Sequence, residues 1–139
     1  MAVTIIKNAS VTINSVDLSS LVESVQITHA AEKVEVTAMG MTSRRYATGL
    51  VADSMVINFY VDFAVTPSAK TEATIYPLVG TTTTVVVKPD SGATSTTNPT
   101  YTYSNAFVES HTPIGNGKVG EIPMTQITLS GGDIVKTTS

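Results

Sequence analysis

Apolar residues occupy every second position of the stretch 54–63, at Met55, Ile57, Phe59, Val61 and Phe63. The positions between them are mostly polar, with Val56 as the exception. Side chains that alternate with a period of two belong to a strand with one buried face and one face that can meet water. The pattern therefore predicts a strand over 54–63, the clearest in the chain.

Shorter patterns of the same kind predict further strands, around 11–13, 24–28, 85–87, 101–110 and 122–129. We expect the strand over 24–28 to continue through Val34 and Val36 after an interruption at Ala30 and Ala31. Between 15 and 21 the sequence SVDLSSL predicts a turn or a single helical turn, because its short polar side chains bond to nearby backbone.

Two of these strands carry a finer prediction. On the strand over 101–110, we expect Tyr101, Tyr103 and Phe107 to share one face. On the strand over 122–129, the apolar spacing changes phase between Met124 and Ile127, which predicts a β-bulge at that point.

One helix is predicted, over 69–79. Ser68 follows Pro67 and is a suitable N-cap, while Gly80 is suited to the end of the helix. Pro77 lacks a backbone N–H, so the helix is expected to be short or kinked. Its inner face is expected to include Ala73 and Tyr76.

The 139 residues fit a single domain over 1–139, with 42% hydrophobic and 14% charged residues. That balance excludes a highly charged disordered chain. Abundant threonine and serine favour strands and turns. We therefore predict an all-β fold with one flanking helix. A net charge of −3 gives no electrostatic footprint for nucleic-acid affinity, and no apolar run is long enough to predict a membrane span.

The segment 31–53 is too long for a tight hairpin, and long loops are usually functional. We expect a long loop arm that contacts another subunit. Arg44 and Arg45 are either solvated or meet carboxylates of a neighbour, so Glu35, Arg44 and Arg45 are the candidate contact residues. The polar tail over 131–139 is expected to project from the domain.

No catalytic or cofactor site is predicted, so we expect no enzymatic activity. Gly115, Gly117 and Gly120 match G-x-G-x-x-G, but a strand-like pattern follows instead of the helix that a dinucleotide site requires. His29 and His111 belong to no ligand or triad motif and are interpreted as ordinary polar histidines. Without cysteine, the chain has neither disulfides nor thiolate metal sites.

The N-terminal sequence does not have the order of a secretory signal. Lys7 follows the short apolar run instead of preceding it. We therefore expect synthesis in a cytoplasm.

Several segments, in this order, resemble the major tail tube proteins of long-tailed (siphovirus-type) bacteriophages. They are INSVDLSSLVESVQIT at 13–28, EKVEVTAMGMTSRRYATGLVADSMVINFYVDF at 32–63, ATIYPLVGTTTTVVVKP at 73–89 and NPTYTYSNAFVESHTPIGNGKVGEIPMTQITLSG at 98–131. The resemblance covers nearly the whole chain. Ser15 stands where family members often have glycine, and Tyr76 stands where tryptophan is common.

The resemblance implies a β-sandwich or partly closed barrel with a flanking helix. It also implies that six subunits form a ring, that rings stack into a hollow tube, and that phage DNA passes through in transit without specific binding. The implied partners are further copies of the chain and the tape measure, tail tip and tail terminator proteins. The implied location is the virion tail, after synthesis in the host bacterial cytoplasm, with no membrane contact.

A wall that passes DNA should not hold phosphates, so it should lack basic residues. We expect Gln26, Asn58 and Asp62 to face the lumen, because they lie on the polar sides of two predicted strands. The alternative is that this polar face forms the outside of the tube.

Other classes of protein remain open at this point. A threonine-rich β-sandwich could be an adhesion module for a receptor or a carbohydrate, but the chain has no tryptophan and few aromatic residues. A hydrolase would need a motif that is absent. A tube protein of a contractile injection system is a closer alternative, which the sequence does not distinguish from a phage tail tube.

Overall fold

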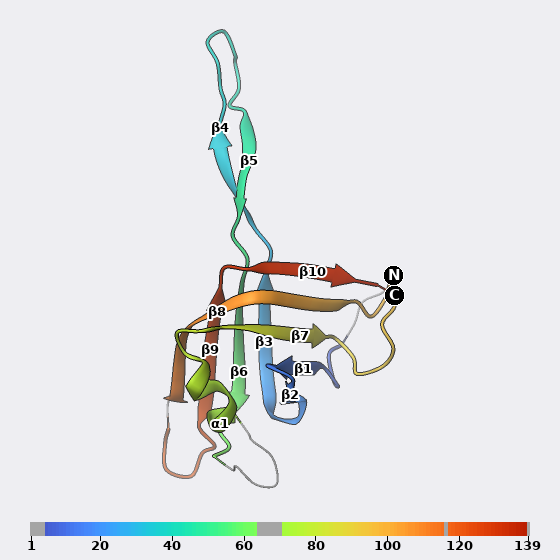
Figure 1. The fold of residues 1–139 in the computed structure, drawn as a ribbon, viewed down its shortest axis with the longest axis vertical. Coiled ribbons are helices and arrows are strands. Elements are labelled where there is room, and N and C mark those ends of the chain that lie inside the picture. The colour runs from blue at the N-terminus through green and yellow to red at the C-terminus, as the bar shows by residue number, and fades with distance from the viewer. Residues whose placement is uncertain (1–4, 64–70, 116, 139) are drawn as a thin grey trace.

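The computed structural model describes residues 5–63, 71–115 and 117–138. It is mostly β, with an eight-stranded antiparallel sheet, a separate two-stranded sheet and one short α-helix (Figure 1). The strands are β1 Ser10–Ile13, β2 Val16–Asp17, β3 Val22–Thr28, β4 Ala31–Glu35, β5 Tyr46–Val51, β6 Ser54–Tyr60, β7 Thr82–Lys88, β8 Thr100–Gly115, β9 Met124–Ser130 and β10 Asp133–Thr137. The helical elements are the 3₁₀ turns η1 Ser19–Leu21 and η2 Tyr76–Leu78 and the helix α1 Thr71–Ile75.

Strand β8 belongs to both halves of the large sheet. Its first part pairs with β7 on one side and with β10 on the other, whereas its second part pairs with β9. The sheet continues from β9 to β6 and β3, and from β7 to β1 and β2. In Figure 1 the strands β3, β6 and β9 run across the direction of β1, β7 and β10. The two halves pack on one shared core, and the sheet is not closed into a barrel.

A local change of conformation in β8 accompanies this change of partner. Asn105 has a φ of 56°, and the pairing with β7 shifts register next to it. Tyr103 is consequently buried while Phe107 is exposed. The prediction that Tyr101, Tyr103 and Phe107 share one face is wrong, because the extra residue of a bulge reverses the phase of alternation.

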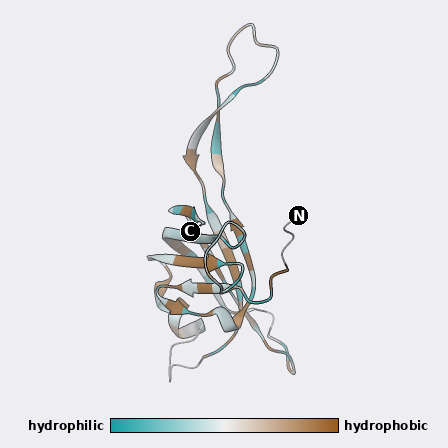
Figure 2. Ribbon diagram, turned by 90° about the vertical axis from the view of Figure 1, so that its right-hand side faces the viewer, coloured by the Kyte–Doolittle hydropathy of each residue, from teal (hydrophilic) through white to brown (hydrophobic). Residues whose placement is uncertain are grey.

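The core is built from the alternating strands. On β6, Met55, Ile57 and Phe59 are fully buried, as the sequence pattern predicts. They meet buried apolar residues of β1, β7, β8 and β9 in one cluster. Figure 2 shows apolar and polar residues interleaved along the strands of the body.

Strand β9 pairs with β6 without interruption from Met124 to Ser130, so the predicted bulge is not in that pairing. The pairing of β9 with β8 does shift register there, since Thr112 pairs with Gln126 and Gly115 with Met124, and the extra residue belongs to β8. On β9 the buried face includes Thr125 and Ile127, whereas Met124 lies on the opposite face. A threonine therefore occupies a buried position at the start of this strand. The hydroxyl of Thr125 donates to the carbonyl of Thr112 at 2.9 Å, and a buried polar group with such a partner costs little.

The C-terminal tail does not project from the domain. Gly131 and Gly132 both have positive φ values and turn the chain back, so that β10 pairs antiparallel with the first part of β8. A Cβ on Gly132 would lie 2.2 Å from the carbonyl oxygen of Ser104, which only glycine avoids.

The flanking helix is present but turned differently from the prediction. Ser68 and Ala69 lie outside the described residues, and the described helix α1 continues into η2 at Pro77. Its buried residues are Thr71, Thr74 and Ile75, whereas Ala73 is half-buried and Tyr76 is exposed. Because two of the buried residues are threonines, the pattern of apolar residues did not indicate which side of the helix faces the core.

We predict that Ile75→Ala lowers the free energy of unfolding of the isolated subunit by about 2–5 kcal/mol, because it opens a cavity in the core. Tyr76→Ala, one residue further on and exposed, is the control and should change that free energy by no more than about 0.5 kcal/mol. Denaturant unfolding of the two variants compares them. Equal destabilisation would contradict the helix orientation described above.

Candidate functional site

The segment predicted as a loop arm is a β-hairpin. Strands β4 and β5 pair antiparallel with each other and with no other described strand, and they extend away from the body (Figure 1). The strand β3 ends at Thr28 and does not run on through Val34 and Val36 as predicted. Every residue of β4 is exposed.

This hairpin exposes many apolar side chains, namely Val34, Val36, Met39, Met41, Tyr46, Leu50 and Val51. An isolated two-stranded hairpin is marginally stable in water. Exposed apolar surface of this extent is typical of an interaction site. The arm is therefore a candidate surface for contact with another molecule.

The tip of the arm holds the predicted contact residues. Arg44 Nη1 lies 3.6 Å from Glu35 Oε1, so the structure pairs two of them within one chain. Both side chains remain largely exposed, and such a pair contributes about 0–1 kcal/mol. The backbone N–H of Arg45 donates to the Thr37 hydroxyl at 3.0 Å, and Arg45 is itself exposed. The tip thus offers cations for further contacts.

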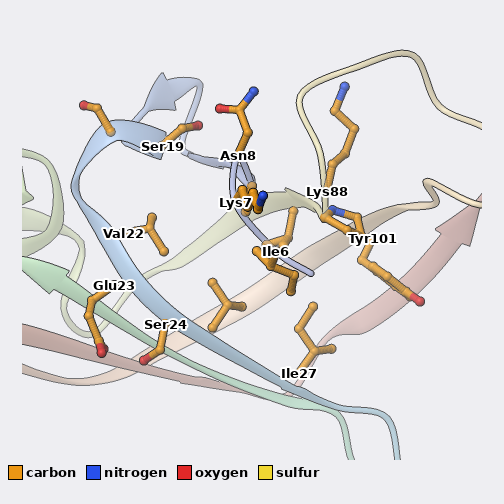
Figure 3. Close-up of a pocket in the computed structure, with 15 residues that line it drawn as sticks. Ile6, Lys7, Asn8, Ser19, Val22, Glu23, Ser24, Ile27, Lys88 and Tyr101 are labelled. Atoms are coloured by element: carbon orange, nitrogen blue, oxygen red, sulfur yellow. The ribbon is translucent and has the colours of Figure 1, made fainter. Parts of the chain in front are cut away.

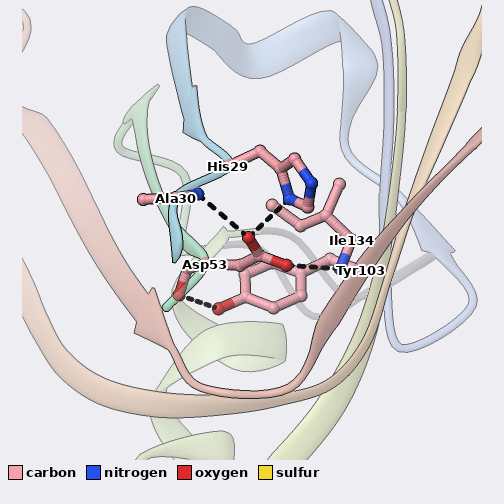
Figure 4. Close-up of polar contacts among 5 residues, drawn as sticks. All are labelled: His29, Ala30, Asp53, Tyr103 and Ile134. Carbon is pink, nitrogen blue, oxygen red and sulfur yellow. Dashed lines mark hydrogen bonds and ion pairs between the residues drawn. The ribbon is translucent and has the colours of Figure 1, made fainter. Parts of the chain in front are cut away.

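The root of the arm is fixed by one buried carboxylate, that of Asp53 (Figure 4). Its Oδ1 accepts from the Ala30 N–H at 3.3 Å and lies 2.6 Å from Nδ1 of His29. Its Oδ2 accepts from the Ile134 N–H at 2.9 Å. The side chain of Asp53 is 1% exposed and that of His29 is 67% exposed. One carboxylate therefore joins both strands of the arm root to β10.

A second contact ties the same residue to the core. The buried hydroxyl of Tyr103 donates to the backbone carbonyl of Asp53 at 2.9 Å. Burial, followed by the nearby charges of Asp53 and Glu109, raises the pKa of Tyr103 to about 12. Sequence reasoning missed Asp53. The one signal in the sequence is the position of Asp53, directly before the strand with the most regular alternation of apolar residues. A carboxylate that is buried at such a position needs hydrogen-bond donors.

A polar face covers one side of the sheet formed by β3, β6, β9 and the second part of β8. Paired residues form rows across it, such as Ser24, Asn58 and Gln126 and, one row on, Gln26, Val56 and Thr128. Nδ2 of Asn58 donates to the Ser24 hydroxyl at 2.9 Å. These four strands contain no lysine or arginine, and their only acidic residues are Glu23 and Glu109.

Two of the three residues predicted to face a lumen lie on this polar face. Gln26 and Asn58 are brought close together by the pairing of β3 with β6. Asp62 lies two residues beyond the end of β6, in the connection to α1, where its N–H donates to the Thr71 hydroxyl at 3.0 Å. Asp62 therefore belongs to the end of this face and not to its paired rows.

The same four strands have two free edges among the described residues. Strand β3 pairs with β6 alone. Beyond Val108, strand β8 pairs with β9 alone. Exposed strand edges promote association with another strand. The sheet is therefore open on both sides to an additional strand.

The described residues hold no group of three or more histidine, aspartate or glutamate side chains that could bind a metal ion. His111 Nε2 lies 2.9 Å from the Thr125 hydroxyl, and His29 joins Asp53, so both histidines take part in structural contacts. The G-x-G-x-x-G match falls at the end of β8 and in the connection to β9, with no helix among the described residues there. No helix that the structure describes is long and apolar enough to span a membrane.

Comparison with known proteins gives no match to a family model and no match to a curated protein. Solved structures do match. A chain of the virion of a native gene transfer agent particle has a TM-score of 0.72 at 14% identity, covering 97% of this chain and 99% of that chain. A chain of the SPP1 tail tube has a TM-score of 0.68 at 14% identity, covering 94% of this chain and 77% of that chain.

Contractile systems match as well. A chain of the PVC sheath–tube complex, an extracellular contractile injection system, has a TM-score of 0.68 at 13% identity, covering 95% of this chain and 89% of that chain. At these identities the likeness establishes the fold. This chain has the tail tube fold, built on an antiparallel sheet that is not a closed barrel.

We predict that Asp53→Ala destabilises the subunit by about 1–3 kcal/mol, because two partly buried hydrogen bonds, to the N–H groups of Ala30 and Ile134, are lost. The Ile134 amide should then exchange its hydrogen faster in native-state exchange experiments. His29→Ala is the control, since it removes only the exposed partner and should cost no more than about 1 kcal/mol. An Ile134 amide equally protected in Asp53→Ala would contradict the role of this carboxylate.

Proposed function

We propose that this chain is the structural protein of a phage tail tube, whose copies form rings that stack into a hollow tube for DNA delivery. The observation that carries the proposal is a sheet with a polar, cation-free face and two free edges, set in the tail tube fold. The protein acts by assembly and is not an enzyme.

The direction of the strands permits a ring. Strands β3, β6, β9 and the second part of β8 each run antiparallel to their neighbour. When one copy is rotated beside another, the β8 edge of the first copy meets the β3 edge of the next in antiparallel orientation. Such a heterologous contact repeats until the ring closes, and closure removes the free edges. The resemblance to phage tail tube proteins suggests six copies per ring.

In this ring the polar face lines the lumen. Its apolar opposite side is occupied by the core of each subunit, so that side cannot line the channel. Gln26 and Asn58 then face the channel within the paired rows, with Asp62 near one end. A wall with carboxylates and no cations does not bind phosphates, so a duplex passes without being held.

The arm supplies contacts between rings. Its exposed apolar side chains and the residues Glu35, Arg44 and Arg45 project beyond the sheet that forms the ring, where a neighbouring ring is stacked. The tape measure, tail tip and tail terminator proteins are the further partners, and the location is the virion tail. The protein is made in the cytoplasm of the host bacterium.

A tube protein of a contractile injection system is the second candidate, supported by the similar TM-score of the PVC chain. The two candidates share the assembly and differ in whether DNA passes through the tube. An adhesion module is not favoured, because the matching structures belong to tubes.

Purified protein at high concentration should form rings or hollow tubes in electron micrographs, with a tail initiator complex added if none form spontaneously. Free edges and an uncovered arm are the physical reason. A protein that remains monomeric in light scattering under both conditions would contradict the proposed function.

Arg44→Glu combined with Arg45→Glu should leave the thermal unfolding of the subunit unchanged and reduce the yield of long tubes at least tenfold. The side chains are exposed, so the fold does not depend on them, whereas reversed charges at the arm tip repel the carboxylates that they are proposed to meet. Tube length in electron micrographs is the measurement.

One control accompanies this pair. Arg44→Lys with Arg45→Lys keeps the charge and should allow long tubes. Normal tubes from the double glutamate variant would mean that the arginines are merely solvated.

A further inference from the structure

A cavity of about 700 Å³ opens beside the free edge of β3 (Figure 3). Its lining includes the apolar side chains of Val22, Val25 and Ile27 from β3, together with Val87 at the end of β7 and Ile6. Polar residues at the cavity, among them Lys7, Asn8, Ser20, Lys88 and Tyr101, complete the lining. We call this site the β3 groove.

The β3 groove exists because the core is left uncovered on that side. Val22, Val25 and Ile27 pack against the core cluster, yet they are only partly buried. Beyond β3 no described strand follows in this sheet. Apolar side chains at the open side of a core gain free energy when another surface excludes water from them.

A projecting apolar group lies at the opposite edge of the same sheet. Tyr76, at the start of η2, is 60% exposed, and Val79, just after η2, is 44% exposed. The ring of Tyr76 contacts that of His111 on β8 edge to face, with centroids 6.2 Å apart. The buried Ile75 next to it anchors the segment to the core. The group is thus held firmly while its apolar surface faces outward.

The β3 groove and the Tyr76 group lie in the same row of paired residues across the sheet. Val25 pairs with Ile57, Ile57 pairs with Ile127, and Ile127 pairs with His111, the residue that Tyr76 touches. Both features also lie on the core side of the sheet, since Val25 packs on the core and His111 bonds the buried Thr125.

We propose that the β3 groove receives Tyr76 and Val79 of the adjacent copy in the ring. This inference rests on the proposed function, because the β8 edge of one copy must meet the β3 edge of the next. When these edges meet without stagger, Tyr76 of the first copy lies beside Val25 of the second. The partner is a second copy of this chain, and the contact is heterologous.

The chemistry of the two surfaces is complementary. A tyrosine ring supplies a large apolar body for the floor of the groove and a hydroxyl for its polar rim. Lys7 and Lys88 stand at that rim, where an ammonium group can also lie over an aromatic face. Aromatic residues inserted into such pockets are the typical centres of protein interfaces.

Cross-linking tests this contact, because the chain has no cysteine of its own. The variant Tyr76→Cys with Val25→Cys is assembled and then oxidised. Within one chain, Val25 is separated by three strand spacings, about 14 Å, from His111, the residue that Tyr76 contacts, so an intrachain disulfide is not expected. A ladder of covalent dimers, trimers and larger species on a non-reducing gel is expected. Each single-cysteine variant should stop at the monomer or the dimer.

A second groove position and a matched control complete the test. Tyr76→Cys with Ser20→Cys uses an exposed rim position, so it does not depend on how the core tolerates Val25→Cys. Tyr76→Cys with Val135→Cys places the second thiol on β10, outside the groove, and should give no ladder. Tyr76→Ala should fold like wild type and form at least tenfold fewer rings or tubes.

The outcomes distinguish this inference from the function on which it rests. If wild-type protein forms no rings or tubes at all, the proposed function fails and takes the inference with it. If tubes form, yet neither groove pair gives a ladder and Tyr76→Ala assembles like wild type, the groove contact is wrong while the tube function stands.

Discussion

The buried carboxylate of Asp53 is the interaction on which the geometry of the molecule depends. It lies between the arm and β6 and accepts hydrogen bonds from the other strand root at Ala30 and from β10 at Ile134. The strands β4 and β5 of the arm pair with no strand of the body among the described residues. A buried carboxylate is destabilised when it loses a hydrogen-bond donor, so breaking either of these two hydrogen bonds costs free energy. The arm therefore leaves the sheet in a fixed direction.

A fixed arm and an open sheet together define a subunit that is incomplete alone. The sheet has a free edge at β3 and another beyond Val108 on β8, and the arm exposes apolar side chains. In the proposed tube, contacts through the sheet edges extend the assembly sideways, and contacts through the arm extend it along the axis. The two kinds of contact use different surfaces, which is compatible with rings that stack.

The sequence predicted the features that depend on regular alternation. The buried and polar faces of β6 follow from it, and so does the polar face that Gln26 and Asn58 share. It failed where a single residue shifts the phase, as the left-handed Asn105 does in β8. It also failed where a buried threonine takes an apolar position, as Thr125 does in β9. A threonine is a polar residue in hydrophobicity scales, and the hydrogen bond of Thr125 to the Thr112 carbonyl offsets the cost of its burial.

Two larger elements escaped prediction for a different reason. Strands β4 and β10 have short, weak apolar patterns, and the apolar residues of β5 do not alternate with polar ones. Their strand structure depends on pairing with a partner, which composition alone does not reveal. The carboxylate of Asp53 shares this property, since its three partners come from distant parts of the chain.

The most direct test of the proposed assembly is a cryo-electron microscopy map of the assembled protein. We expect the β3 edge of each subunit to pair with β8 of the next, and Gln26 and Asn58 to line the bore. A map in which Gln26 and Asn58 lie on the outer surface, or in which the β3 edge remains unpaired, would contradict it.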